Sequence, residues 1–126
     1  MLNKIILMGR LTKDPEIRHT KNDTPVAGFS LAVERDYSKK GEAREVDFFD
    51  IVAWKGQAEF VSKYFTKGQL VCVEGRLQRR SWIDNDNKTR YAYEVIAGSI
   101  HFAGFNKNNG QSNEQEFDPF EDGIVA

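Results

Sequence analysis

The 126-residue sequence contains little cysteine and proline, with one cysteine and three prolines. A single cysteine, Cys72, excludes a disulfide within the chain. Because Cys72 lies in the apolar run 70–73, we expect a small buried hydrophobic residue rather than a nucleophile or metal ligand. The two histidines, His19 and His101, are far apart and have no cysteine or carboxylate at metal-ligand spacing. The sequence therefore predicts no metal site.

Long apolar runs are also missing. No stretch has the length of a membrane span, and residues 1–4 lead directly into a strand pattern instead of a signal peptide. These features predict a cytoplasmic protein. The length suits one domain with its own core and a short remainder.

The net charge is close to zero, but the charges are unevenly distributed along the chain. Residues 1–104 carry 17 Lys and Arg against 14 Asp and Glu, whereas residues 105–126 carry one against five. The second segment also begins with a bias toward Gly, Asn and Gln, which is typical of disorder. We therefore expect a mildly basic domain over residues 1–104 and a disordered acidic C-terminal tail over residues 105–126.

Alternation of apolar and polar residues predicts an all-β domain. Strands are expected at residues 5–11, 27–34, 46–55, 73–82 and 90–95, and a short helix at 58–65. Gly68 follows the helical pattern as an expected stop signal. Three strands, one helix and two strands form the order of the oligonucleotide-binding (OB) fold, in which the helix closes one end of a barrel. The sequence thus predicts a five-stranded OB-fold barrel with one short helix between strands three and four.

The last two predicted strands form a hairpin, residues 73–98, which we call the finger. Side chains two residues apart point to the same face of a strand, so Arg76, Arg80 and Trp82 share one face. An indole on a polar face is unusual for a soluble domain. This combination indicates a surface that binds a ligand.

The third predicted strand has apolar residues of both parities. If Phe49, Ile51 and Ala53 face the core, Phe48 and Trp54 emerge on the opposite face. At about 3.3 Å per residue, these two aromatic residues are roughly 20 Å apart. The strand therefore offers two separate aromatic platforms on one exposed surface.

Exposed aromatic residues beside cations are typical of surfaces that bind single-stranded nucleic acid. Every base has a face for stacking, worth about 1–3 kcal/mol per base, so such a surface tolerates any sequence. The surrounding cations would follow the phosphates. The predicted platforms are Tyr37, Phe48, Trp54 and Trp82, and the predicted phosphate contacts are Arg10, Arg35, Lys55, Lys67, Arg76 and Arg80.

Other function classes stay open on the residues alone. Aromatic residues in strands are usually packing residues, and cations are often an ordinary solvated surface. A barrel that binds protein, such as a primosome-type accessory module, would use exposed aromatic residues as interface anchors. An enzyme of nucleic-acid metabolism is a more distant alternative, since no nucleophile, metal cluster or phosphate loop appears at recognisable spacing. Asp47 and Asp50 suggest a nuclease metal pair, but they are three apart on a strand and fall on opposite faces.

Four segments resemble the bacterial single-stranded DNA-binding proteins, the SSB family. They read "NKIILMGRLTKDPEIR", "FSLAVERDYSKKGE", "WKGQAEFVSKYFTKGQLVCVEGRL" and "RSWIDNDNKTRYAYEVIA", and the match runs through most of residues 1–104. The resemblance implies a homotetramer that wraps single-stranded DNA during replication, recombination and repair, with no catalysis and no cofactor. It also implies that the stacking platforms are Tyr37, Phe48, Trp54 and Trp82. A main replication factor and a specialised paralogue both remain open.

The acidic tail departs from the family pattern. Family members that recruit replication and repair proteins usually end in an acidic tip closing on Pro-Phe. Here the segment 118–120, Asp-Pro-Phe, is internal, and the sequence ends with Ile-Val-Ala at 124–126. We therefore expect the tail to recruit replication and repair proteins poorly or not at all.

Overall fold

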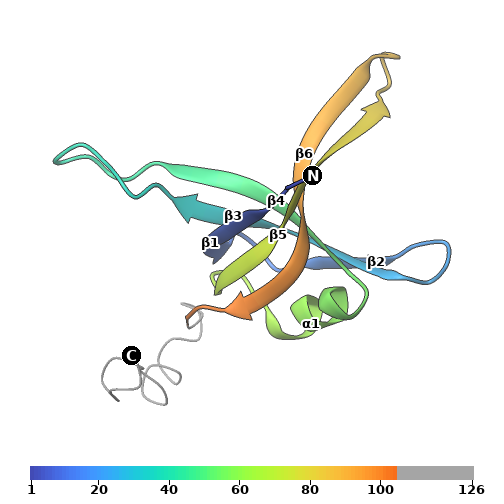
Figure 1. Cartoon of the computed structure of the whole chain (residues 1–126), viewed down its shortest axis with the longest axis horizontal. Coiled ribbons are helices and arrows are strands. Elements are labelled where there is room, and N and C mark those ends of the chain that lie inside the picture. The colour runs from blue at the N-terminus through green and yellow to red at the C-terminus, as the bar shows by residue number, and fades with distance from the viewer. Residues whose placement is uncertain (105–126) are drawn as a thin grey trace.

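The structure, a computed structural model, describes residues 1–104 as a six-stranded sheet with one short helix (Figure 1). The strands are β1 (Ile5–Leu11), β2 (Glu16–His19), β3 (Pro25–Glu34), β4 (Val46–Trp54), β5 (Leu70–Ile83) and β6 (Thr89–Phe102), and the helix α1 (Gly56–Tyr64) lies between β4 and β5. The predicted tail, residues 105–126, lies outside the described residues. In residues 1–104, no helix is both long enough and apolar enough to cross a membrane.

The sheet closes on itself, as the OB fold requires. Its order is β1-β5-β6-β4-β3-β2, and a further antiparallel pairing joins β1 to β3 at Arg10↔Ala32 and Leu11↔Leu31. Five strands therefore form the predicted barrel, with the helix between the third and fourth of them.

The sixth strand, β2, was not predicted. All four of its residues are exposed, so it has no buried alternation that a sequence pattern would reveal. It forms because its backbone pairs with β3, from Glu16↔Gly28 to His19↔Pro25. The five predicted barrel strands are therefore present, and β2 is an additional strand paired with the beginning of β3.

The core lies inside the barrel and under α1. Ile51 and Ala53 are buried, as their parity predicts, and Phe49 packs against the same core. Val61 of α1 is fully buried, and Phe65 just after the helix packs edge-on against Phe102 with ring centroids 4.9 Å apart. The buried cluster comprises Leu11, Phe29, Leu31, Ile51, Ala53, Val61, Phe65, Val71, Val73 and Val95.

Two local predictions were wrong. Cys72 is only partly buried, because Val71 and Val73 take the inward positions of β5 and alternation turns Cys72 outward. Gly68 does not stop the helix, which ends at Tyr64 with Phe65 already extended. Gly68 instead has φ 88° in the following turn, where the Gln69 N–H donates to the Thr66 carbonyl at 3.1 Å, a position that favours glycine.

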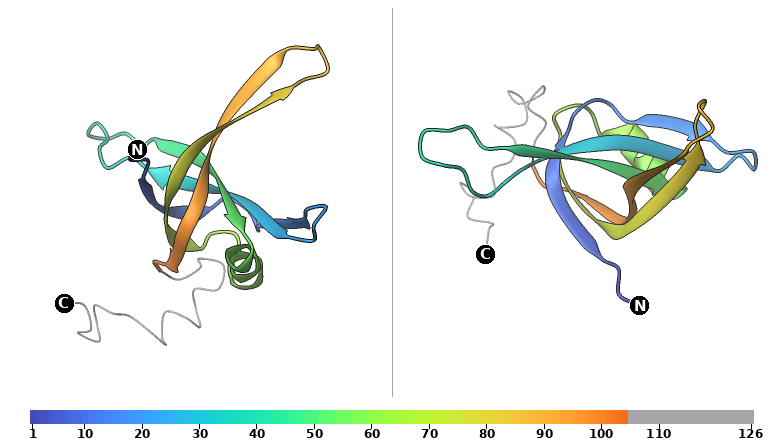
Figure 2. Two further views of the ribbon diagram at one scale, coloured as in Figure 1. Left: turned by 45° about the vertical axis from the view of Figure 1, so that its right-hand side comes forward. Right: turned by 90° about the horizontal axis from the view of Figure 1, so that it is seen from above.

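The finger projects from the barrel as a two-stranded ribbon (Figures 1 and 2). β6 pairs with β4 only at Ile51↔Val95 and Val52↔Ile96, so toward the tip it pairs with β5 alone. A register shift at Glu74/Gly75 marks the place where β5 bends. A Cβ atom at Gly75 would lie 2.1 Å from the Ile96 carbonyl oxygen, so this close approach requires glycine.

Candidate nucleic-acid interface

Pairing across three strands places the central predicted residues on one face of the sheet. Val52 of β4 pairs with Ile96 of β6, and Ile96 pairs with Arg76 of β5. Paired residues share a face, and every second residue along each strand joins them. This surface, which we call the site face, carries Phe48, Trp54, Arg76, Arg80 and Trp82.

The aromatic residues of the site face are accessible to a ligand. Phe48 is 66% exposed, Trp54 43% and Trp82 40%. Tyr37, in the loop between β3 and β4, is also exposed. On β4, Phe48 and Trp54 are exposed on one face, whereas Ile51 is buried on the other face.

A groove of about 690 Å³ brings two of the predicted residues together, Trp54 of β4 and Arg80 of β5. Gly28, Ser30 and Val52, which lie along β3 and β4, also line it. Its other lining residues are Lys13, Glu16, Arg18, His19, Thr20, Val26, Phe29, Asp50, Ile51 and Glu94. Its lining residues come mainly from five strands, β2 to β6.

Two cations of this groove, Lys13 and Arg18, were missed by sequence reasoning. Arg18 pairs with Val26, and Val26 pairs with Trp54, so Arg18 belongs to the row that contains this indole. The predicted strands at residues 5–11 and 27–34 did not include this segment. Because every residue of β2 is exposed, only the spacing of Glu16 and Arg18, two residues apart, could have indicated a strand here.

Arg80 is held between an aromatic ring and a carboxylate. Its guanidinium carbon lies 4.7 Å from the Trp82 ring centroid, and its Nε lies 3.5 Å from a Glu94 carboxylate oxygen. Arg76 donates from Nη1 to the side-chain oxygen of Gln78 at 2.5 Å. A guanidinium has five N–H donors, so both arginines keep the capacity to bind a phosphate as well.

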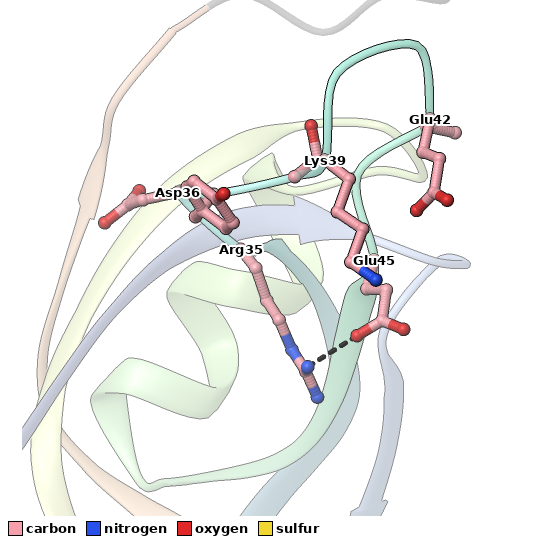
Figure 3. Close-up of a pocket in the computed structure, with 8 residues that line it drawn as sticks. Arg35, Asp36, Lys39, Glu42 and Glu45 are labelled. Atoms are coloured by element: carbon pink, nitrogen blue, oxygen red, sulfur yellow. Dashed lines mark hydrogen bonds and ion pairs between the residues drawn. The ribbon is translucent and has the colours of Figure 1, made fainter.

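Arg35 has a different environment, at the base of the β3–β4 hairpin. Its Nε and Nη2 donate to the two carboxylate oxygens of Asp47, each at 3.0 Å, and its Nη1 donates to Glu45 at 2.5 Å. The hydrogen bond from Arg35 lowers the pKa of Asp47, and the same contact raises the pKa of Arg35. Figure 3 shows the guanidinium directed at Glu45. The pocket beside these residues has a volume of about 430 Å³ and is also lined by Tyr37.

This ion-pair cluster bears on the predicted role of Arg35. Asp47 pairs with Val33, a residue of the inward parity, so Asp47 and its partner lie on the opposite side of the hairpin from Phe48. A phosphate would have to compete with two carboxylates for this guanidinium. The contact between Arg35 and DNA stays a prediction. In the structure, the ion pairs of Arg35 join the two sides of the β3–β4 hairpin, whose loop contains Tyr37.

The other predicted cations lie around the barrel. Arg10 pairs with Ala32, which in turn pairs with Phe48, and its Nη1 donates to the Gly68 carbonyl at 2.9 Å. Lys55 directly follows Trp54, with a left-handed φ of 57° that turns the chain into α1. The backbone N–H of Lys67 donates to Asp14 at 2.8 Å in the loop before β5. None of these three lines the groove.

Possible metal ligands are scattered. In the described part of the chain, no group of three or more His, Cys, Asp or Glu side chains is arranged to hold a metal ion. Asp47 pairs with Val33 and Asp50 with Ser30, so the two carboxylates point to opposite faces, as their spacing predicts.

The barrel and the site face define an OB-fold protein with the aromatic and basic surface of a single-strand binder. The model of the single-strand binding protein family matches residues 2–103, and the chain belongs to this family. The chain is 44% identical over 119 residues to a single-stranded DNA-binding protein of Halalkalibacterium halodurans, covering 93% of this chain and 71% of the relative. Single-stranded DNA-binding protein 3 of Clostridium acetobutylicum is 44% identical over 117 residues, covering 90% and 81%. A Staphylococcus aureus single-stranded DNA-binding protein is 45% identical over 116 residues, covering 92% and 73%. The resemblance seen in the sequence is confirmed.

Proposed function

We propose that this protein binds single-stranded DNA without sequence specificity and protects it during replication, recombination and repair. The observation that carries the proposal is the site face, where Phe48, Trp54 and Trp82 are exposed beside Arg76 and Arg80. Membership of the single-strand binding family and the names of the relatives favour DNA as the ligand.

The mechanism needs only stacking and charge neutralisation. Bases stack on Phe48, Trp54, Trp82 and the loop residue Tyr37, at about 1–3 kcal/mol per base. Phosphates are held by the cations on and around the site face, namely Arg10, Lys55, Lys67, Arg76 and Arg80, and by Arg35 where DNA displaces its carboxylate partners. Binding breaks no covalent bond, so the proposal includes no catalytic residue, metal or cofactor. It places the protein in the cytoplasm, where bacterial DNA is.

A homotetramer is part of the proposal. Ile6 and Met8 are exposed apolar residues on the outward parity of β1. Within the described residues, the stretch 5–9 of β1 pairs only with β5, so its other edge is open. An open strand edge is a template for pairing with another chain, and exposed apolar patches mark interaction sites. Light scattering is expected to give four copies, and a monomer at micromolar concentration would contradict this.

Intrinsic fluorescence provides a direct test, because the only two tryptophans of the chain, Trp54 and Trp82, both lie on the site face. Titration with poly-dT should strongly quench the fluorescence of both tryptophans. A duplex should bind much more weakly, because its bases are already stacked on one another. Each phosphate contact should contribute a slope of about −0.7 to the dependence of log affinity on log salt. Equal affinity for duplex, or a failure to bind at low salt, would contradict the proposal and favour a protein-binding barrel.

A further inference from the structure

The finger has a second exposed face, on the side opposite Trp82. This far face consists of Leu77, Arg79, Ser81 and Ile83 on β5 and Thr89, Tyr91 and Tyr93 on β6. Tyr91 is 55% exposed and Tyr93 is 62% exposed, so both rings are more accessible than the Trp82 ring at 40%. The mechanism above leaves these two tyrosines unused.

The far face repeats the arrangement of the site face. The guanidinium carbon of Arg79 lies 4.4 Å from the Tyr91 ring centroid, as that of Arg80 lies 4.7 Å from the Trp82 centroid. Aromatic rings and guanidinium planes are the surfaces on which proteins stack unpaired bases. Both faces of the finger therefore have the chemistry to hold a base and a phosphate.

Charge and size favour a nucleic acid over a protein as the ligand. Arg79 is the single charged residue of the far face, so no carboxylate there repels a phosphate. The finger as a whole is also basic: residues 76–94 carry five Arg or Lys and three Asp or Glu. Two of those carboxylates, on Asp84 and Glu94, are already paired with arginines. A protein partner would require a larger surface, because a typical protein interface uses about 20–30 residues a side and the far face offers seven.

The two faces are joined by a short path. Neighbouring strands are about 4.8 Å apart, so a two-stranded ribbon is narrow. Arg90, on the site face opposite Trp82, is the direct neighbour of Tyr91 on the far face. Toward the tip, β6 pairs only with β5, and its outer edge is open in the described residues.

We propose that a single strand of DNA leaving Trp82 continues round the open edge of β6 onto the far face. There Tyr91 and Tyr93 each stack a base, and Arg79 holds a phosphate. The inference rests on the proposed function, because it extends the path of the same strand. It makes the finger a two-sided clamp for one strand.

The test compares oligo-dT of increasing length on three forms of the full chain. The double variant Tyr91→Thr/Tyr93→Thr removes both rings and keeps a high strand propensity, whereas Tyr91→Phe/Tyr93→Phe keeps the rings. Short oligonucleotides that fill only the site face should bind all three forms equally. Longer ones should bind the threonine variant more weakly by roughly thirtyfold or more, because two stacked bases are lost at about 1–3 kcal/mol each, and should bind the phenylalanine variant normally. Thermal melts of the free proteins check that the finger is intact.

A second readout locates the contact directly. Photocrosslinking with 5-iodo-deoxyuridine oligonucleotides, followed by mass spectrometry, should yield adducts on the far face in addition to Trp82. If the threonine variant binds every length like the wild type, or adducts form on Trp82 alone, the far-face inference is wrong and the proposed function stands. If the wild type binds oligo-dT of no length at low salt, the proposed function itself fails. If the threonine variant changes the mass of the free protein by light scattering, the far face is an interface between copies and the inference is overturned.

Discussion

Phe48 and Phe49 provide a matched pair that separates DNA binding from folding. They are adjacent on β4 and chemically identical, but they point to opposite faces of the sheet. Phe48 lies on the site face opposite Ala32, whereas Phe49 lies opposite the buried Leu31 and packs against the core. Phe48→Ala and Phe49→Ala should therefore have opposite effects.

The expected magnitudes follow from burial. Full burial of a phenylalanine side chain contributes about 1.5–3 kcal/mol. Phe48 is 66% exposed, so its covered third should contribute roughly 0.5–1 kcal/mol to folding, and less if the denatured state already covers part of the ring. Removing a packed phenylalanine such as Phe49 costs about 3–5 kcal/mol, with the partial exposure of Phe49 placing it near the lower limit.

Two measurements on each variant give the result. Thermal or denaturant unfolding should show a small loss of stability for Phe48→Ala and a large loss for Phe49→Ala. Titration with a short oligo-dT should show about five- to a hundredfold weaker binding for Phe48→Ala, because one stacked base is lost. Under conditions where Phe49→Ala is fully folded, its affinity should stay close to that of the wild type. Normal affinity of Phe48→Ala, or a loss of stability as large as that of Phe49→Ala, would refute the assignment of Phe48 as a stacking platform.

Three further predictions concern charge. Arg80→Ala should weaken binding to every sequence alike and reduce the salt slope by about 0.7, and an unchanged slope would show that Arg80 holds no phosphate. The lowered pKa of Asp47 means that its ion pair with Arg35 stabilises the folded state above the unfolded pKa of about 3.9 and loses this effect as the pH falls through the folded pKa. Acid unfolding of Asp47→Asn should thus depend less on pH in that range than acid unfolding of the wild type. Truncation after Gly104 should preserve the fold and slightly tighten DNA binding at low salt, since the acidic segment then no longer competes for the basic surface, whereas loss of binding would place the site outside the barrel.

The class of fold and the composition of the site face could be predicted from local patterns in the sequence. Alternation along a strand is a local property, so parity alone separated Phe48 and Trp54 from Ile51 and Ala53. The order of strands and helix, together with the family segments, gave the OB barrel that the structure contains. Where the sequence interpretation failed, as at Cys72 and β2, the local sequence lacked a clear alternation between apolar and polar residues.

Contacts between distant strands became visible only in the folded barrel. Trp54 and Arg80 line one groove only because β4 and β6 pair in parallel and the Gly75 bulge sets the register of β5. Arg35 reads as a free cation in the sequence, yet the β3–β4 register places it against Asp47. Strand pairing depends on the free energy of the whole barrel rather than on neighbouring residues, so these partners could not be read from periodicity.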